Sequence, residues 1–425
     1  MKYHYEFVII GGGLSGLSAA FFLQLKGRKT LVIEQHQDVG GHARTEYSQG
    51  GMFDWTGHWL HLKDGPVKEM IQVEFPGQFM EISRNAVIFM DGNYIPYPFQ
   101  AHTAYCGFEE ADKIRDSYRN RPNPGSKTFK DLLISAFGHE MYRVFFEPYN
   151  FKIWGADPEI LAGKLTAGYV PVPVDSEVIE GSKSHRILQT GYNQTFLYPI
   201  SGGIGSLGKN ISKKLNADTL RTNLKVIKVE PHNHLVYTAA GDSFSYDILI
   251  NTSFLPDFVD LTEGFPGRPD FSYRNLIFAD VLKRKKKYEK PFHWAYIPDI
   301  SCPVYRLGKY SDAVPYLGSE DLHSCYVEFA PCASEMTKDE LQESTSELMI
   351  KMELIDSPED ISYFRLRSIR GAYPHFTTAY PQSIETTRSF YEQNSIYLLG
   401  RFGSFIYSSM GSDMENARIL AEKLG

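Results

Sequence analysis

A run of three glycines near the N-terminus constrains the fold of this chain more than any other feature. Residues 7–10 are entirely apolar, Gly11-Gly12-Gly13 follows them, and residues 14–26 are rich in Ala, Leu and Phe before Gly27. Residues 30–33 form a second apolar run. Short apolar runs are typical of parallel strands buried on both faces, and a strand–helix–strand unit needs about 30 residues. The sequence therefore begins with a predicted βαβ unit.

The spacing of these glycines predicts that the unit binds a dinucleotide. In Gly11-x-Gly13-x-x-Gly16 the first glycine permits a tight turn, the second admits a pyrophosphate, and the third lets helix and strand pack closely. Glu34 follows the second strand, where an acid binds a ribose. A glycine turn without a ligand is the alternative, and the strand, helix and acid together disfavour it. The predicted contacts are Gly11, Gly13, Leu14, Ser15, Gly16, Glu34 and Gln35.

A second glycine motif follows the second strand and separates FAD from NAD, which the first motif does not do. Gly40-Gly41-His42-Ala43-Arg44 resembles the GG-x-x-R signature of the amine-oxidase-like FAD superfamily. A basic residue there can contact the diphosphate. We therefore add Gly41, His42 and Arg44 to the predicted FAD contacts. Because the chain has one dinucleotide fingerprint, a separate NADPH-binding domain is not indicated.

Composition excludes several other classes of function. The chain has 425 residues, which predicts two or three domains. Its net charge of -7 argues against nucleic-acid binding. Four cysteines without CxxC spacing give no zinc signature, and no apolar stretch approaches the roughly 20 residues of a membrane span. We expect a cytoplasmic protein without a signal peptide. The basic run at 283–287 is expected to be a solvated loop.

The distribution of strand and helix patterns predicts an α/β fold whose Rossmann-type FAD-binding domain is assembled from discontinuous segments. Residues 246–252 resemble a third buried strand, residues 395–424 a strand, a glycine loop and a helix, and residues 108–166 carry helical patterning. From about 270 to 375 short strands dominate. The predicted division is 1–75, 200–255 and 390–425 for the FAD-binding domain, 105–170 for a helical insert, and 76–104, 171–199 and 256–389 for a mainly antiparallel substrate-binding sheet domain.

Several further motifs resemble UDP-galactopyranose mutases in the same order along the chain. They are Gly57-His58-Trp59-Leu60-His61, the segment 149–158 around Lys152-Ile153-Trp154-Gly155, the segment 191–199 with Asn193, the segments 293–298 and 302–306, Ala372-Tyr373-Pro374, and Gly400-Arg401-Phe402-Gly403 with Tyr407. The resemblance implies an FAD-dependent enzyme that interconverts the pyranose and furanose forms of a nucleotide-linked sugar through reduced flavin, in surface polysaccharide or glycan biosynthesis. External NAD(P)H is a possible reductant, and the oligomeric state is open.

The resemblance also assigns roles to individual residues. His58, Arg306, Tyr373 and Tyr407 are the predicted catalytic residues: Arg306 suits a leaving diphosphate because a guanidinium binds it bidentately, and His58 lies near the flavin. Each tyrosine alone is as easily a core aromatic, and His58 an ordinary loop histidine. The further predicted cofactor contacts are Gly57, His58, Trp59, Val226, Gly400, Arg401, Ser409 and Met410. The predicted substrate contacts are Trp154, Arg186, Asn193, Tyr305, Arg306, Tyr373 and Tyr407.

One departure from the family pattern keeps two other functions open. Residues 174–180 contain no arginine where the family has its second diphosphate arginine, and Arg186 is the nearest substitute. This departure favours an FAD-dependent oxidoreductase of the amine oxidase or protoporphyrinogen oxidase type. A third hypothesis is a flavin-bound scaffold without catalytic activity. A complete fingerprint beside a polar, aromatic cleft disfavours the scaffold.

Overall fold

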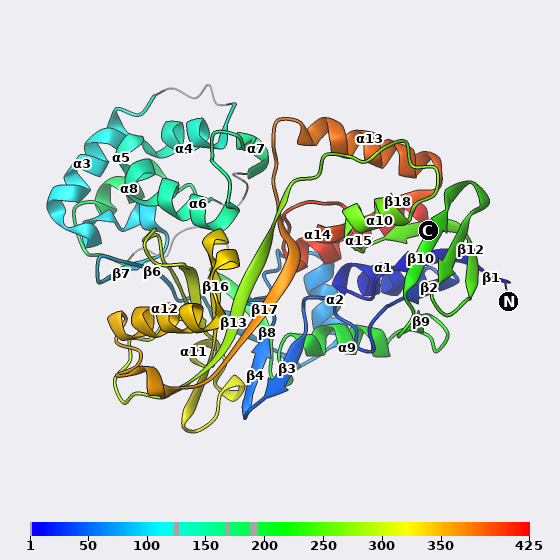
Figure 1. Ribbon diagram of the computed structural model, residues 1–425, viewed down its shortest axis with the longest axis horizontal. Coiled ribbons are helices and arrows are strands. Elements are labelled where there is room, and N and C mark those ends of the chain that lie inside the picture. The colour runs from blue at the N-terminus through cyan, green and yellow to red at the C-terminus, as the bar shows by residue number, and fades with distance from the viewer. Residues whose placement is uncertain (1, 123–126, 167, 169, 188–193) are drawn as a thin grey trace.

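The computed structural model describes residues 2–122, 127–166, 168, 170–187 and 194–425. Within that part the chain forms two seven-stranded sheets and a separate group of helices (Figure 1). The first sheet is largely parallel and Rossmann-like, and the second is mainly antiparallel. The predicted α/β class, with a Rossmann-type domain beside an antiparallel sheet, is therefore confirmed.

The first sheet draws its strands from distant parts of the chain. Its order is β10-β11-β12-β1-β2-β9, and β18 pairs with β12 as well. The strands are β1 (Lys2–Ile10), β2 (Thr30–Ile33), β9 (Leu220–Arg221), β10 (Val226–Glu230), β11 (Leu235–Thr238), β12 (Ser243–Asn251) and β18 (Ile396–Leu398). Strands β12, β1, β2, β9 and β18 form parallel pairs, whereas β10 and β11 add an antiparallel edge. The four residues of β2 are all buried, as expected for a strand covered on both faces.

Helices from both ends of the chain cover this sheet side by side. Helix α1 (Leu14–Leu25) packs against α15 (Met410–Leu424) and α9 (Gly205–Lys213) (Figure 1). Leu23, Ala417 and Ala421 are buried in the shared core. The first glycine turn leads into α1, and Ser409 caps the start of α15. Both helix N-termini therefore lie at the same end of the sheet.

The second sheet has the order β17-β13-β16-β15-β14-β6-β7. Its strands are β6 (Ala86–Met90), β7 (Asn93–Pro96), β13 (Tyr273–Arg284), β14 (Trp294–Tyr296), β15 (Val304–Lys309), β16 (Leu322–Phe329) and β17 (Ile361–Pro374). All neighbours are antiparallel except β14 and β6. The long strands β13 and β17 run from this sheet toward the first one (Figure 1). Residues far apart in sequence thereby meet between the two sheets.

A group of short helices packs on one face of the second sheet. It contains α3 (Phe108–Arg119), α4 (Phe129–Phe137), α5 (His139–Met141), a π-helical turn (Tyr142–Phe146), α6 (Glu147–Trp154), α7 (Gly163–Thr166) and α8 (Asp175–Gly181). The helical pattern around 128–149 is interrupted because Gly138 has a φ of +83°, and α6 ends at Gly155 in the left-handed region. Helix α8 packs on residues 99–106 rather than on a sheet, so part of 171–199 lies with the helices.

The remaining described elements connect these layers. They are β3 (Thr45–Ser48) with β4 (Gly51–Asp54), β5 (Phe79–Ser83) with β8 (Thr195–Pro199), α2 (Pro66–Glu74), α10 (Leu255–Leu261), α11 (Tyr310–Ala313), α12 (Lys338–Lys351), α13 (Tyr380–Gln393) and α14 (Gly400–Gly403). The basic run departs from expectation at its first residue. Lys283 is fully buried at the end of β13 and its Nζ lies 2.5 Å from Glu289, so only the later lysines belong to a solvated turn.

Candidate functional site

A cavity of about 650 Å³ lies where the carboxyl ends of β1, β2 and β12 face the second sheet. Ligand sites of α/β proteins lie at this edge of the parallel sheet. Most of the predicted site residues line the cavity: Gly11, Gly13, Leu14, Ser15, Glu34, Gln35, Gly41, His42, Arg44, Gly57, His58, Trp59, Val226, Arg306, Tyr373, Arg401, Tyr407, Ser409 and Met410. The sequence motifs, although scattered along the chain, therefore describe one site.

The glycine turn has the backbone geometry that its motif predicts. Gly11 has a φ of +104°, and a Cβ on Gly16 would lie 2.0 Å from the carbonyl oxygen of Gly11. Gly16 is therefore buried against the turn and does not line the cavity; its role is packing. Gly400 is also absent from the cavity wall, because it packs on the side chain of Ser15. Gly16 and Gly400 therefore pack behind the cavity wall and do not line the cavity.

The residues around the turn fit the dinucleotide that the motif implies. Glu34 accepts hydrogen bonds from the backbone N–H groups of Gly12 at 2.7 Å and His36 at 2.8 Å, which fixes its carboxylate at the end of β2. A Cβ on Gly13 would meet only the Gly41 backbone at 3.8 Å, so the space above this turn is open. No side chain caps the N-terminus of α1, and its N–H groups are available to a phosphate.

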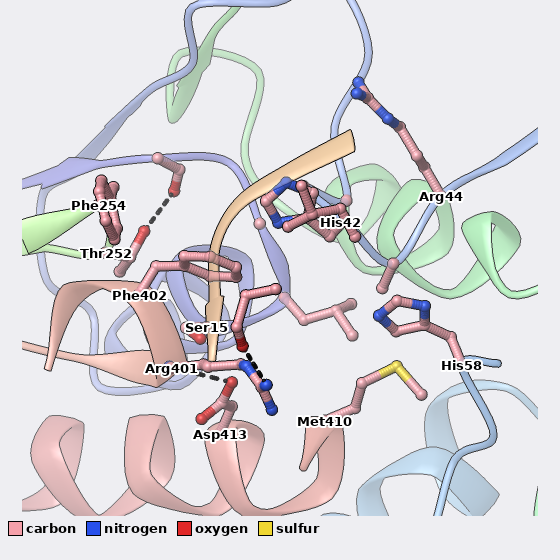
Figure 2. A pocket seen from close by; sticks show the side chains of 18 of the residues that line it. Ser15, His42, Arg44, His58, Thr252, Phe254, Arg401, Phe402, Met410 and Asp413 are labelled. Carbon is pink, nitrogen blue, oxygen red and sulfur yellow. Dashed lines mark hydrogen bonds between the residues drawn. The ribbon is translucent and has the colours of Figure 1, made fainter. Parts of the chain in front are cut away.

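The loop that carries His58 is held firmly by its neighbours. Tyr310 OH donates hydrogen bonds to the carbonyl oxygens of Asp54 and Thr56, both at 2.9 Å. Burial and, after it, the positive charge of Arg401 lower the pKa of His58 to about 4, so the ring is neutral at pH 7. Its Nδ1 is buried without a hydrogen-bond partner in the described part of the chain. Figure 2 shows His58, Met410 and Arg401 around the same space.

Arg306 lies on the cavity wall with a partner that the motifs do not reveal. Its Nε and Nη2 donate to the two oxygens of Glu328 at 2.9 and 2.6 Å, and the Glu328 side chain is fully buried. Although burial opposes its charge, Glu328 raises the pKa of Arg306, so the guanidinium stays ionised. Tyr305 OH donates to Glu328 and lies 3.0 Å from Tyr373 OH. Glu328 is the one acidic residue of β16 (Leu322–Phe329), between Val327 and Phe329, and an acid in this buried stretch was the sequence signal for it.

Tyr373, Arg401 and Tyr407 form another part of the cavity wall. Tyr373 and Tyr407 are stacked, with ring centres 5.7 Å apart and an interplanar angle of 20°. Arg401 lies over the Tyr407 ring at 4.1 Å and donates to the carbonyl oxygen of Ser408 at 2.9 Å and that of Ala372. Figure 2 places Arg401 beside Asp413. The backbone N–H of Arg401 donates a hydrogen bond to the Asp413 carboxylate at 3.2 Å.

Several predicted substrate contacts lie elsewhere. Trp154 is buried behind the wall, edge-on to Tyr373 and Tyr407, and Tyr305 is buried beneath Tyr373. Arg186 is exposed and is not among the described residues that line the cavity. Asn193 lies outside the described residues. Apolar neighbours hold Trp154 in the core, whereas sequence position alone could not distinguish a wall from the layer behind it.

Another arginine, which sequence reasoning missed, occupies the cavity wall near Arg306. Arg84 follows β5 and its guanidinium lies 4.7 Å from the centre of the Tyr97 ring. Tyr97 packs against Tyr296 with ring centres 5.3 Å apart. Burial raises the pKa of Tyr296, whereas the charges of Arg306 and Arg84 both lower it, so both arginines act on this hydroxyl. The other unpredicted wall residues on this side are His61, Trp294 and Tyr326.

No group of three His, Cys, Asp or Glu side chains is arranged to hold a metal ion among residues that the structure describes. In the same part of the chain, no helix has both the length and the apolar character needed to cross a bilayer.

Comparison with known proteins supports the fold assignment for the N-terminal segment and for the chain as a whole. Residues 9–72 match the family described as an NAD(P)-binding Rossmann-like domain. The whole chain superimposes on a crystal structure of reduced UDP-galactopyranose mutase with a TM-score of 0.92 and 22% identity, over 99% of this chain and 93% of that one. The chain therefore has the fold of UDP-galactopyranose mutase, which confirms the structural side of the resemblance.

Curated relatives match shorter stretches. The chain is 24% identical over 250 residues to dTDP-fucopyranose mutase of Escherichia coli, which covers 56% of this chain and 64% of that protein. It is 30% identical over 125 residues to polyamine oxidase 2 of Arabidopsis thaliana, which covers 26% of each. The matched segments thus span less than two thirds of these relatives. Both a sugar-nucleotide mutase and an amine-type oxidase are similar to this chain.

Proposed function

We propose that this protein is an FAD-dependent mutase that interconverts the pyranose and furanose forms of a nucleotide-linked sugar. The observation that carries the proposal is the cavity wall beyond the glycine turn, where Arg84 and Arg306 flank Tyr296. Guanidinium and phenol groups together suit a ligand that carries phosphates and sugar hydroxyls. The place of the reaction in surface polysaccharide or glycan biosynthesis is part of the same proposal.

The charge of this wall disfavours a cationic amine. The carboxylates that line the described cavity are Glu34, Asp38, Asp257 and Asp413. Glu34 and Asp38 follow β2, Asp257 pairs with Arg370 at 2.7 Å, and Asp413 lies beside Arg401. Glu328 does not line the cavity; it pairs with Arg306 behind the wall. An amine placed there would be repelled by the guanidinium of Arg84, whereas a diphosphate is attracted by Arg84 and can accept hydrogen bonds from the remaining N–H groups of Arg306.

The chain supplies binding, orientation and charge to this reaction. Arg306, held rigid by Glu328, and Arg84 would bind the diphosphate, and the hydroxyl groups of Tyr373 and Tyr407 would orient it. His58 is neutral at pH 7 and can donate or accept a hydrogen bond without adding charge. Reduced flavin, when bound, supplies the nucleophile for the anomeric carbon of the sugar. NAD(P)H from solution is the proposed reductant.

An FAD-dependent oxidoreductase of the amine oxidase type is the second candidate. The local match to polyamine oxidase 2 and the lack of an arginine in residues 174–180 favour it. The two candidates differ in their net reaction. The mutase oxidises neither the substrate nor the flavin overall, whereas the oxidase consumes an electron acceptor.

One experiment separates the two candidates. The purified flavoprotein is reduced with dithionite under anaerobic conditions and incubated with UDP-galactopyranose and a panel of other sugar nucleotides, and the products are separated by chromatography. We expect furanose formation with the reduced protein and none with the oxidised protein. Absence of interconversion across the panel, together with flavin bleaching by a polyamine and recovery in air, would establish the oxidase instead.

A further inference from the structure

Arg44 is an unusual cation among the residues that line the cavity. Its Nε is buried and has no hydrogen-bond partner among the described residues. No carboxylate of the described chain pairs with it, although its neighbours Arg365 and Arg367 both pair with Glu46 and Asp280. Burial lowers the pKa of Arg44; the nearby carboxylates of Glu46, Glu34 and Asp38 oppose this shift, and the charge of Arg367 adds to it. A half-buried guanidinium in this setting is primed to receive an anion.

The side chain that holds Arg44 in place is Trp55. The guanidinium carbon of Arg44 lies 3.9 Å from the centre of the Trp55 ring, a close cation–π contact. Trp55 Nε1 donates to Glu46 at 2.9 Å, and its backbone N–H donates to the Arg44 carbonyl oxygen at 3.3 Å. Ring and backbone together therefore leave Arg44 few alternative orientations.

The same ring also contacts the second sheet. The guanidinium carbon of Arg367, on β17, lies 4.5 Å from the centre of the Trp55 ring. Arg367 forms an ion pair with Glu46 and lies 3.5 Å from Asp280 on β13. Arg44 follows the second glycine turn, whose Gly41 approaches Gly13 of the first. A stack of Arg44, Trp55 and Arg367 thus connects the glycine turns to the second sheet.

We propose that Trp55 is a positioning residue that holds Arg44 at the cavity as the cation for a dinucleotide diphosphate. Arg367, which is itself paired with Glu46 and Asp280, makes the second cation–π contact of the Trp55 ring and so helps to fix the ring in place. Retention of FAD by Arg44 and Trp55 does not depend on which reaction the flavin catalyses.

The test measures FAD binding to the apoprotein by quenching of flavin fluorescence. We expect Arg44→Ala and Trp55→Leu each to weaken binding about 10- to 100-fold, the range of one charge-assisted contact. Trp55→Phe keeps an aromatic face and is expected to stay within about threefold of the wild type. Trp154→Phe is the matched control, since this buried ring carries no arginine and lies outside the cavity; it is expected to leave FAD affinity unchanged.

A double variant separates positioning from general loss of structure. If Trp55 acts through Arg44, adding Trp55→Leu to Arg44→Ala weakens FAD binding by less than about twofold more. The rise in melting temperature on adding FAD should also be smaller in Trp55→Leu than in Trp55→Phe. Effects that multiply in the double variant, or an unchanged affinity in Trp55→Leu, overturn the proposal.

A conservative variant keeps the inference testable if Trp55→Leu does not fold. Arg44→Lys retains the charge at a half-exposed position but loses the planar group that stacks on the ring. We expect about tenfold weaker FAD binding in Arg44→Lys, with the fold preserved by circular dichroism. Wild-type affinity in this variant would show that stacking on Trp55 is irrelevant and would overturn the proposal.

Discussion

Arg306 and Glu328 form a bidentate ion pair in which the arginine faces the cavity and the glutamate is completely buried. Removing the carboxylate leaves a guanidinium without its counter-ion in a site of low polarity, a change that costs about 3–5 kcal/mol in buried pairs. We therefore expect Glu328→Gln to lower the free energy of unfolding by about 3 kcal/mol, measured by urea denaturation. Wild-type stability in this variant would contradict the assigned role.

Arg84, rather than Arg186, is predicted to be the second arginine for an anionic substrate. Arg84→Ala should weaken binding of UDP to the flavoprotein about 10- to 100-fold and reduce the salt dependence of that binding, because one direct charge is lost. Arg186→Ala is the matched control, since this exposed side chain lies away from the cavity. Isothermal titration calorimetry at low and high salt measures both variants. The reverse ranking would restore the assignment suggested by sequence.

Asp54 should make stability depend on pH. Its carboxylate accepts hydrogen bonds from Thr45 Oγ1 at 2.5 Å, Tyr198 OH at 2.5 Å and the backbone N–H of Ile204 at 3.3 Å, and burial raises its pKa to about 7. The folded protein thus retains a proton between about pH 4 and pH 7 that the unfolded chain has released. The free energy of unfolding therefore contains a contribution from Asp54 that falls as pH rises through this window, by up to about 4 kcal/mol.

The variant Asp54→Asn isolates this contribution. Buried histidines titrate in the wild type and in the variant alike, so their effect cancels when the two stabilities are subtracted. The stability of Asp54→Asn relative to the wild type should increase from pH 4.5 to pH 7.5, measured by urea denaturation at each pH. A difference that stays constant across this range would show that Asp54 is ionised throughout.

Lys152 is predicted to be structural, although it lies in a segment that resembles a substrate cleft. Its Nζ donates to the carbonyl oxygens of Ile297, Asp299 and Val304 at 2.9, 2.6 and 2.7 Å. Lys152→Met removes all three hydrogen bonds, although the Asp299 carbonyl keeps the backbone N–H of Cys302 at 3.3 Å, and each lost partner costs about 1–3 kcal/mol. We expect a loss of at least 3 kcal/mol and faster amide hydrogen exchange around residues 297–304. Retained protection there would argue against the assignment.

Local patterns predicted those features in which the backbone itself forms the site. The glycine turn, Glu34 and the buried strands β1 and β2 follow from spacing and apolar runs, because the chemistry of a tight turn depends on adjacent residues. Arg84 and Glu328 were missed because their places depend on strand pairing: β5 pairs with β8 ahead of Arg84 on the cavity wall, and the β15–β16 pairing sets Glu328 beside Arg306 behind that wall. A motif records neighbours in sequence, and these residues become neighbours only when the second sheet assembles.

The contact between α1 and α15 has a consequence for synthesis on the ribosome. The apolar face of α1, residues 14–25, remains without its partner until residues 410–424 have emerged, nearly 400 residues later. At about 5–20 residues per second, that face is exposed for some tens of seconds. Since Arg401, Ser409 and Met410 also line the cavity, cofactor loading is expected to be a late, post-translational step. A chaperone that shields apolar helices would act in this interval.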